Sequence, residues 1–275
     1  MDRLESLLAQ LRANLRERGS ALIAFSGGTD STLLLRIAAE ELGDRVAALT
    51  ARSPIFPRRE TDQSLKLAGQ MGVPQVMVDT DELACAEFSE NPTDRCYHCK
   101  KALYAICRDK AREMNLEHVL DGTNVEDARD YRPGSRAAQE AGVGSPLAQC
   151  GLGKAEIREL SKRLGLPTWD KPQMACLASR FPYGTRITAD RLECVERCEE
   201  LLRQMGFGQV RVRFHDALAR IEVEQADINR LLEPEVRSKI VDHFKENGFA
   251  YVAVDLQGYR TGSLNEILGK GEEGE

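Results

Sequence analysis

A glycine turn between a buried strand and a helix is the feature that most constrains how this chain folds. Residues 21–25 (ALIAF) form a short, wholly apolar run, which is typical of a strand buried on both faces of a parallel sheet. The turn itself is SGGTDS at residues 26–31, and apolar residues at helical spacing follow it: Leu33, Leu34, Ile37, Ala38 and Leu42. Because two glycines admit close approach of an anion and a helix N-terminus supplies unpaired N–H groups, the turn is predicted to bind phosphate.

The side chains of this turn suit a nucleotide with its metal. Ser26 and Ser31 add hydroxyl donors, and Asp30 is placed either to hold a magnesium ion or to cap the helix. The chain contains no GxxxxGK[ST] motif, so this is not the Walker P-loop. A tight strand–helix turn with no ligand is the alternative, and the complete hexapeptide after an apolar strand favours phosphate binding over it.

The pattern beyond the turn predicts an α/β fold with a doubly wound, mostly parallel sheet. Strands are predicted at 46–50, 76–79 and around 119–120, and they alternate with helices predicted at 61–71 and 100–114. Strands that alternate with helices in this way form βαβ units, whose strands are parallel.

The pattern of apolar and charged residues changes after Pro182, and the new pattern predicts a smaller α+β domain. A helix is predicted at 189–204, and residues 209–215 and 218–224 then alternate apolar with charged side chains, as half-exposed strands do. We therefore predict an α/β domain that contains the turn and the cysteine loops at 1–185, a smaller α+β domain at 186–268, and a disordered tail at 269–275.

Composition excludes several classes of protein. The chain has 275 residues and a formal net charge of −6, which argues against broad nucleic-acid binding. It has no apolar run long enough to cross a membrane, and its charged N-terminus does not resemble a secretory signal. We therefore expect a cytoplasmic protein, in which the 8 cysteines serve metal binding or catalysis more readily than disulfides.

Cys96 and Cys99 form a CxxC motif (RCYHCKK, 95–101) whose four basic or potentially basic neighbours favour thiolates. The motif alone admits an iron–sulfur site, half of a zinc site, or a redox or structural pair. Structural zinc usually takes four protein ligands, and the chain has no second CxxC. A redox CxxC usually lies at a helix start that follows a strand, whereas the preceding residues NPTDR are typical of a loop. The iron–sulfur interpretation is therefore the strongest of the three.

Three further cysteines have sequence neighbours that predict different roles. Cys176 lies in a polar loop with Lys171 and Arg180 nearby, which favours an accessible and reactive thiol. Cys194 and Cys198 share a helix face, but they lie among apolar residues and glutamates and are more simply explained as small buried side chains.

The ordered set of motifs resembles a known family. SGGTDS is similar to the pyrophosphatase-type (PP-loop) turn of the adenine-nucleotide α-hydrolase superfamily. The complete set resembles the LarE family of ATP-dependent sulfur transferases, in this order along the chain: SGGTDS, RCYHCK, DGTN (121–124), DYRPG (130–134), SPL (145–147), KP (171–172) and CLASR (176–180).

The resemblance implies a reaction. LarE proteins adenylate the two carboxylates of pyridinium-3,5-biscarboxylic acid mononucleotide with ATP and convert them to thiocarboxylates for the nickel-pincer cofactor of lactate racemase. Some members sacrifice the sulfur of one cysteine, whose position Cys176 occupies here. Others hold a 4Fe-4S cluster on three cysteines, which here would be Cys96, Cys99 and Cys176, with one iron left for exogenous sulfide.

Further roles carry over from the resemblance. ATP and Mg²⁺ would be bound by the turn and by the end of the fourth strand: Ser26, Gly27, Gly28, Asp30, Ser31, Gly122 and Asn124. Arg180, Arg211 and Arg213 would gather the substrate phosphate, although Arg211 and Arg213 could instead form an exposed strand face balanced by Glu222 and Glu224. One glutamate in the range 196–200 is a further candidate to bind a divalent metal. The family also implies a homo-oligomer, a small nucleotide substrate and a sulfide or other sulfur donor.

Three other functions compete with this one. An ammonia-dependent amidotransferase with the same loop leaves the three cysteines without a role. A tRNA-thiolating enzyme predicts a basic surface, which a net charge of −6 does not favour. A zinc- or thiol-based nucleotide-binding regulator predicts ATP binding without release of pyrophosphate.

Overall fold

The computed structural model describes residues 3–129, 133–172, 174–260 and 262–267. The predicted disordered tail at 269–275 lies outside these ranges, as do Asp130, Tyr131 and Arg132 of the DYRPG motif. The chain divides into two compact units, Met1–Glu82 with Thr93–Met174 (unit 1) and Leu83–Pro92 with Ala175–Glu275 (unit 2). This division falls before the boundary predicted near residue 185, and it places a short earlier segment in the second unit.

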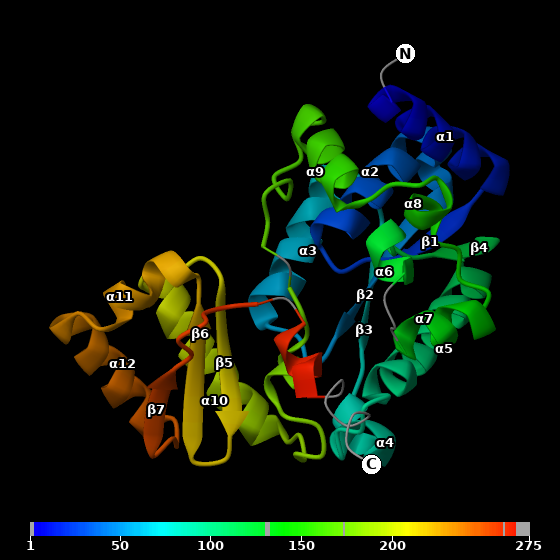
Figure 1. Cartoon of the computed structure of the whole chain (residues 1–275). Coiled ribbons are helices and arrows are strands. Elements are labelled where there is room, and N and C mark those ends of the chain that lie inside the picture. Colours follow the sequence, from blue (N-terminus) through cyan, green and yellow to red (C-terminus); the bar gives the residue numbers. More distant parts are fainter. Residues whose placement is uncertain (1–2, 130–132, 173, 261, 268–275) are drawn as a thin grey trace, which may run out of the picture. The chain divides into compact units, whose positions relative to one another are not determined.

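Unit 1 is built on a parallel sheet of four strands in the order β3-β2-β1-β4 (Figure 1). The strands are β1 (Ala21–Ala24), β2 (Val46–Arg52), β3 (Gln75–Asp79) and β4 (His118–Leu120). Ile23 of β1 pairs with Ala48 of β2 on one side and with Leu120 of β4 on the other. The strand order therefore reverses at β1, as in a doubly wound fold, and the predicted α/β class is confirmed.

Helices cover both faces of this sheet (Figure 1). They are α1 (Arg3–Arg18), α2 (Thr29–Leu42), α3 (Arg58–Gln70), α5 (Arg95–Glu113), α6 (Val125–Arg129), α7 (Pro133–Glu140), α8 (Pro146–Gln149) and α9 (Lys154–Arg163). Ala21 and Ile23 face a core shared with α1, α2 and α9, whereas Leu22 faces a core shared with α5. The apolar run of β1 is thus buried on both sides, as its sequence predicts.

Helix α5 begins earlier than predicted. It starts at Arg95, so the CxxC motif lies in its first turns and not in a preceding loop. Asp94 stands at the N-cap position without a side-chain capping bond, and its carboxylate pairs instead with His98 at 3.4 Å. Aspartate is among the residues preferred at an N-cap, so the sequence does carry a helix-start signal at Asp94, and the prediction overlooked it.

Unit 2 contains a mixed sheet of three strands in the order β5-β6-β7. Its elements are α4 (Ala86–Ser89), a 3₁₀ turn (Leu177–Arg180), α10 (Ala189–Gln204), β5 (Val210–His215), β6 (Leu218–Val223), α11 (Ile228–Leu231), α12 (Pro234–Glu246) and β7 (Tyr251–Val254). Strands β5 and β6 are antiparallel, and β7 runs parallel to β6. This is the predicted smaller α+β fold.

The expectation that β5 is half exposed is wrong. All residues of β5 from Val210 to Phe214 are buried, including both arginines. Glu222 of β6 is buried as well, and it accepts two hydrogen bonds from Arg213. Alternation of apolar and charged residues predicted a solvent-facing side, but carboxylates within the unit take the place of water.

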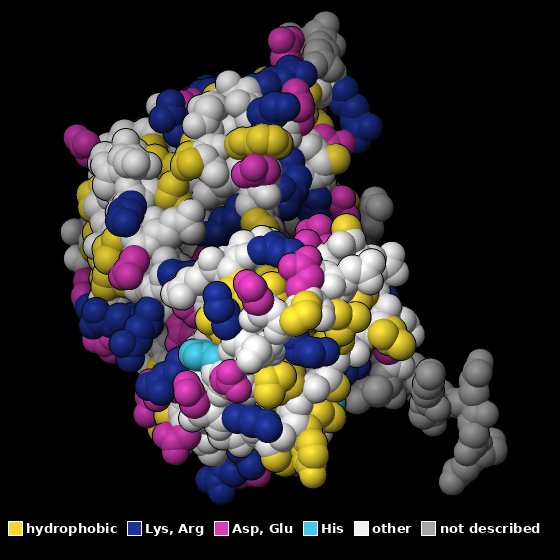
Figure 2. All heavy atoms as spheres, turned by 90° about the vertical axis from the view of Figure 1, so that its left-hand side faces the viewer, with side chains coloured by type: hydrophobic (Ala, Val, Ile, Leu, Met, Phe, Trp, Pro, Cys, Tyr) yellow, Lys and Arg dark blue, Asp and Glu magenta, His cyan; other side chains and the backbone are white. Residues whose placement is uncertain are grey.

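No helix in the ranges that the structure describes is both long and apolar enough to cross a membrane. On the face shown in Figure 2, basic and acidic side chains are interspersed, with hydrophobic side chains between them. Such a surface lacks the single-sign field that attracts a polyanion.

Candidate functional site

The turn at 26–31, called the phosphate-binding turn because the sequence predicts that role, lies at the carboxyl end of β1. Gly27 has a φ of +68°, and a Cβ at this position would lie 3.2 Å from Ser64, so glycine is required for both reasons. The hydroxyls of Ser26 and Ser31 are 3.1 Å apart, and the Ser31 hydroxyl donates to the Gly28 carbonyl. The two hydroxyls that were predicted to contact phosphate therefore lie together in this turn.

Asp30 lies in the first turn of α2, beside the end of β4. The Asn124 side chain donates to its carboxylate at 3.4 Å. Burial, followed by the charge of Asp127, raises the pKa of Asp30 from 3.8 to about 6. A carboxylate held in these surroundings gains from a nearby cation, which suits the predicted magnesium role.

Gly122 and Asn124 occupy the turn after β4, next to the phosphate-binding turn because β1 and β4 are neighbours. A Cβ on Gly122 would lie 2.9 Å from the backbone nitrogen of Ser31. Asn124 is fully buried, and its side-chain oxygen accepts from the Asp127 amide. The predicted ATP-binding residues are therefore brought together at one edge of the sheet, where nucleotides bind in doubly wound folds.

Gly122→Ala is expected to destabilise the chain by about 1–3 kcal/mol, because its methyl group would press on the backbone at Ser31. Nucleotide turnover should fall with it, since the clash displaces the phosphate-binding turn. Gly69→Ala is the matched control: nothing lies within 4 Å of the added methyl group. That helical substitution should stabilise the chain by about 0.5–1 kcal/mol. Urea unfolding of both variants checks the pair, and an unperturbed Gly122→Ala would contradict the close contact.

Asp121 was not assigned a role from the sequence, although it belongs to the DGTN motif. Its buried carboxylate accepts hydrogen bonds from the hydroxyls of Tyr104 at 2.8 Å and Ser145 at 2.7 Å. It also accepts from the amide and hydroxyl of Thr123. Asp121 thus fixes the turn that carries Gly122 and Asn124.

Lys171 is a second residue whose role the sequence did not reveal. Its ammonium group donates to the Gly27 carbonyl at 2.9 Å, and to Glu60 and Gln63 of α3 at 2.7 Å each. Thr29 adds a parallel tie by donating to the Thr168 carbonyl at 2.8 Å. These contacts fasten the phosphate-binding turn to residues far along the chain, and periodicity in the sequence cannot reveal them.

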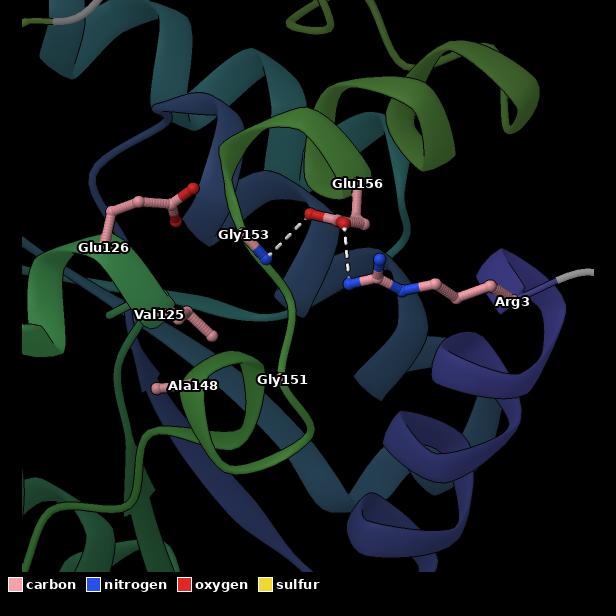
Figure 3. Close-up of a pocket in the computed structure, with 7 residues that line it drawn as sticks. All are labelled: Arg3, Val125, Glu126, Ala148, Gly151, Gly153 and Glu156. Atoms are coloured by element: carbon pink, nitrogen blue, oxygen red, sulfur yellow. Dashed lines mark hydrogen bonds and ion pairs between the residues drawn. The ribbon is translucent and has the colours of Figure 1, made fainter.

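A pocket of about 440 Å³ lies beside the phosphate-binding edge in unit 1 (Figure 3). Its lining includes Glu126 and Glu156, and Glu156 lies between the Gly153 amide and the Arg3 guanidinium. Glu126 accepts from the Lys154 amide, so carboxylates already occupy the N-terminus of α9. This pocket therefore does not favour a phosphate group.

Cys96 and Cys99 lie three residues apart in the first turns of α5, so their side chains share one helix face. Cys96 is exposed and Cys99 is half-buried. Between them, Tyr97 donates to Glu140 at 2.6 Å and stacks under the Arg136 guanidinium at 3.9 Å. Both thiols thus lie at the start of a helix, and basic residues flank them in the sequence.

Cys176 belongs to unit 2, immediately before the 3₁₀ turn, and is half-buried. None of the 8 cysteines forms a disulfide. In the parts of the chain that the structure describes, no three His, Cys, Asp or Glu side chains gather into a set that could hold a metal ion. Cys194 donates to the Asn247 carbonyl and Cys198 is fully buried, in keeping with structural roles.

The three arginines predicted to bind phosphate come together around buried carboxylates. Arg180 is 0% exposed and forms a two-pronged ion pair with Glu199, and Arg213 forms another with Glu222. Arg211 is 3% exposed and stacks near Tyr259, and burial and the adjacent Arg180 lower its pKa to about 10. The three arginines thus belong to a buried network of charges, and the alternative of an exposed strand face for Arg211 and Arg213 is wrong. The role of these arginines toward phosphate stays a prediction.

Comparison with known proteins places the chain among relatives of similar length. No family model matches it. An uncharacterized protein of Synechocystis sp. is 43% identical over 97% of this chain and 100% of its own length. The pyridinium-3,5-bisthiocarboxylic acid mononucleotide synthase of Lactiplantibacillus plantarum is 38% identical over 99% of this chain and 98% of its own length.

A more distant relative supports the fold of unit 1. The glutamine-hydrolyzing GMP synthase of Aeropyrum pernix is 28% identical over 69% of this chain and 40% of its own length. The predicted PP-loop α/β fold is therefore confirmed by the parallel sheet together with this relative. Identity over nearly the full length of both chains shows the narrower group: this chain belongs to the LarE family, that of pyridinium-3,5-bisthiocarboxylic acid mononucleotide synthase.

Proposed function

We propose that the chain is an ATP-dependent sulfur transferase that converts the carboxylates of pyridinium-3,5-biscarboxylic acid mononucleotide to thiocarboxylates. One observation carries the proposal: an intact phosphate-binding edge occurs in a chain that matches the named synthase over nearly its whole length. The relatives of stated activity are synthases, which supports assignment of this chain as an enzyme.

The first half-reaction would activate the substrate. A carboxylate oxygen attacks the α-phosphorus of ATP, the bond to the bridging oxygen breaks, and pyrophosphate leaves. Ser26, Gly28 and Ser31 would hold the departing pyrophosphate, and Asp30 would hold the magnesium ion that neutralises it. The raised pKa of Asp30 supports this assignment, because a bound cation would compensate the buried charge.

The second half-reaction would insert sulfur. A sulfur nucleophile attacks the acyl carbon, the carbon–sulfur bond forms, and AMP leaves with the former carboxylate oxygen. Cys96, Cys99 and Cys176 are soft thiol donors of the kind that iron–sulfur clusters require, and they would hold a 4Fe-4S cluster. When bound, such a cluster supplies an iron that can accept exogenous sulfide.

The substrate phosphate would be bound by Arg211, assisted by the neighbouring cations. Burial and the charge of Arg180 lower the pKa of Arg211, so an anion placed beside it would be stabilised. Arg180 and Arg213 form ion pairs with Glu199 and Glu222 in the folded unit, and Arg211 also lies in the field of Glu199.

Anaerobically purified chain is expected to carry about four irons and at least four acid-labile sulfides. Cys96→Ser and Cys99→Ser should each lose them, whereas Cys85→Ser, which changes an exposed cysteine outside the proposed set, should keep them. Iron and sulfide analysis with a visible spectrum checks this. Zinc, or no metal after reconstitution, would overturn the cluster and leave Cys176 as a sacrificial sulfur source.

The GMP synthase relative keeps an ammonia-dependent reaction as a second candidate. Both reactions release AMP and pyrophosphate, so ATP consumption does not separate them. Supplying the adenylating chain with sulfide or with ammonia does: the proposal expects a thiocarboxylate only with sulfide, and amide formation would favour the second candidate.

A further inference from the structure

The backbone that carries Cys176 is held by two arginines. In unit 2, Nη1 of Arg180 donates to the carbonyls of Ala175 at 2.8 Å and Cys176 at 3.1 Å. The same nitrogen lies 3.0 Å from the Ser179 hydroxyl, and Arg213 donates to the Ser179 carbonyl at 2.8 Å. We call residues 175–179 the Cys176 segment; both of its ends are thus fastened by guanidinium groups.

Arg180 and Arg213 each form a two-pronged ion pair with a buried carboxylate. Glu199 of α10 is 0% exposed and accepts from Nε and Nη2 of Arg180 at 2.7 and 2.9 Å. It also accepts from Arg203 and from the Val212 amide of β5, so the carboxylate is tied to two elements. These charges hold the pKa of Glu199 well below its usual value, at about 2.

The ion pair of Arg213 has the same geometry as that of Arg180. Glu222 of β6 accepts from Nε and Nη2 of Arg213 at 2.9 and 2.7 Å. The remaining nitrogen, Nη1, is the one that reaches the Ser179 carbonyl. In both arginines the planar fork therefore spans a carboxylate on one side and the Cys176 segment on the other, which a lysine cannot do.

We propose that Arg180 and Arg213 are positioning residues that fix the Cys176 segment and so set the direction of the Cys176 thiol. The inference rests on the proposed function in assigning the sulfur-transfer site to Cys176. A substrate phosphate at Arg180 would compete with Glu199, and the buried carboxylate would lose two of its hydrogen bonds, which is unfavourable. The two arginines thus act on the sulfur side of the reaction through the protein backbone.

Arg180→Lys tests the proposal in the full chain. Lysine preserves the positive charge beside Glu199, so the unit is expected to fold, but it loses the fork that reaches the carbonyls. Arg203→Lys is the matched control, because Arg203 pairs with the same carboxylate from within α10. Hydrogen exchange of the amides in 175–179 and the alkylation rate of Cys176, resolved by peptide mass spectrometry, are measured without ATP or substrate.

We expect amide exchange in the segment to rise about tenfold in Arg180→Lys and to stay within about twofold in Arg203→Lys. Alkylation of Cys176 should accelerate with it. Sulfur transfer should fall through kcat, while pyrophosphate release and the KM for the nucleotide substrate hold. Unchanged exchange and alkylation, or a raised KM with unchanged kcat, would overturn the proposal, the latter in favour of phosphate binding.

Glu222→Gln provides a second variant should Arg180→Lys fail to fold. It removes the charge of the carboxylate that holds Arg213. Amide hydrogen exchange should then rise at the end of the Cys176 segment near Ser179. Because these readouts need no substrate, a loosened segment in a chain whose wild type forms no thiocarboxylate would refute the proposed function and leave the positioning role standing.

Discussion

Cys176→Ala is expected to abolish sulfur transfer while pyrophosphate release continues. The phosphate-binding turn lies in unit 1 and Cys176 lies in unit 2. The substitution therefore leaves the described contacts of that turn in place. Removing the thiol takes away both a cluster ligand and the alternative sacrificial sulfur. Parallel assays of pyrophosphate and thiocarboxylate, under sulfide, measure the separation.

Cys194→Ala is the control for this experiment, because Cys194 is also a half-buried thiol of unit 2, with the Asn247 carbonyl and Cys198 as its neighbours. It should retain both activities. Sulfur transfer that persists in Cys176→Ala would refute the role assigned to Cys176 under either sulfur strategy.

Asp30→Asn is expected to remove ATP turnover and to stabilise the ligand-free chain. Asparagine keeps an oxygen that can accept from Asn124 but cannot hold a magnesium ion as a carboxylate does. The pKa of Asp30 is raised from 3.8 to about 6, so the ionised form costs about 3 kcal/mol of folding free energy at neutral pH. The variant avoids this cost.

The pH dependence of this stability cost follows from proton binding by Asp30. The folded chain holds the Asp30 proton more tightly than the unfolded chain, so the cost is absent below pH 3.8, grows up to about pH 6, and is complete above it. The stability difference between Asp30→Asn and wild type should therefore increase from pH 4 to pH 7. Denaturant unfolding of both chains across this range measures it.

Normal ATP consumption by Asp30→Asn would show that the phosphate-binding turn has only a structural role. A stability difference that stays constant with pH would show that Asp30 is not held in a destabilising environment. Saturating magnesium and ATP should reverse the ranking, because ligand binding stabilises only the chain that retains the carboxylate.

Local patterns predicted the parts of the fold that local forces determine. The apolar run before SGGTDS indicated a strand buried on both faces, and β1 is such a strand. The turn could be placed because glycines and a following helix form a recognisable unit over a few residues. The parallel direction of the strands could also be anticipated, since strands that alternate with helices form βαβ units.

The charged interior of unit 2 could not be predicted in this way. Alternation in VRVRFH indicated an exposed face, whereas Arg213 is buried in an ion pair with Glu222 of the next strand. Glu199 of α10 lies against the same strand, where it accepts from the Val212 amide and pairs with Arg180. Such pairing joins residues far apart in the sequence and has no periodic signature. The same holds for Lys171, whose contacts reach back more than a hundred residues.

Formation of the thiocarboxylate itself tests the central claim most directly. Anaerobic chain would be mixed with ATP, magnesium, sulfide and pyridinium-3,5-biscarboxylic acid mononucleotide, and the products followed by mass spectrometry. We predict exchange of carboxylate oxygen for sulfur, with one AMP and one pyrophosphate released for each sulfur inserted. ATP cleavage without any sulfur in the nucleotide product, or sulfur insertion without ATP, would contradict the account.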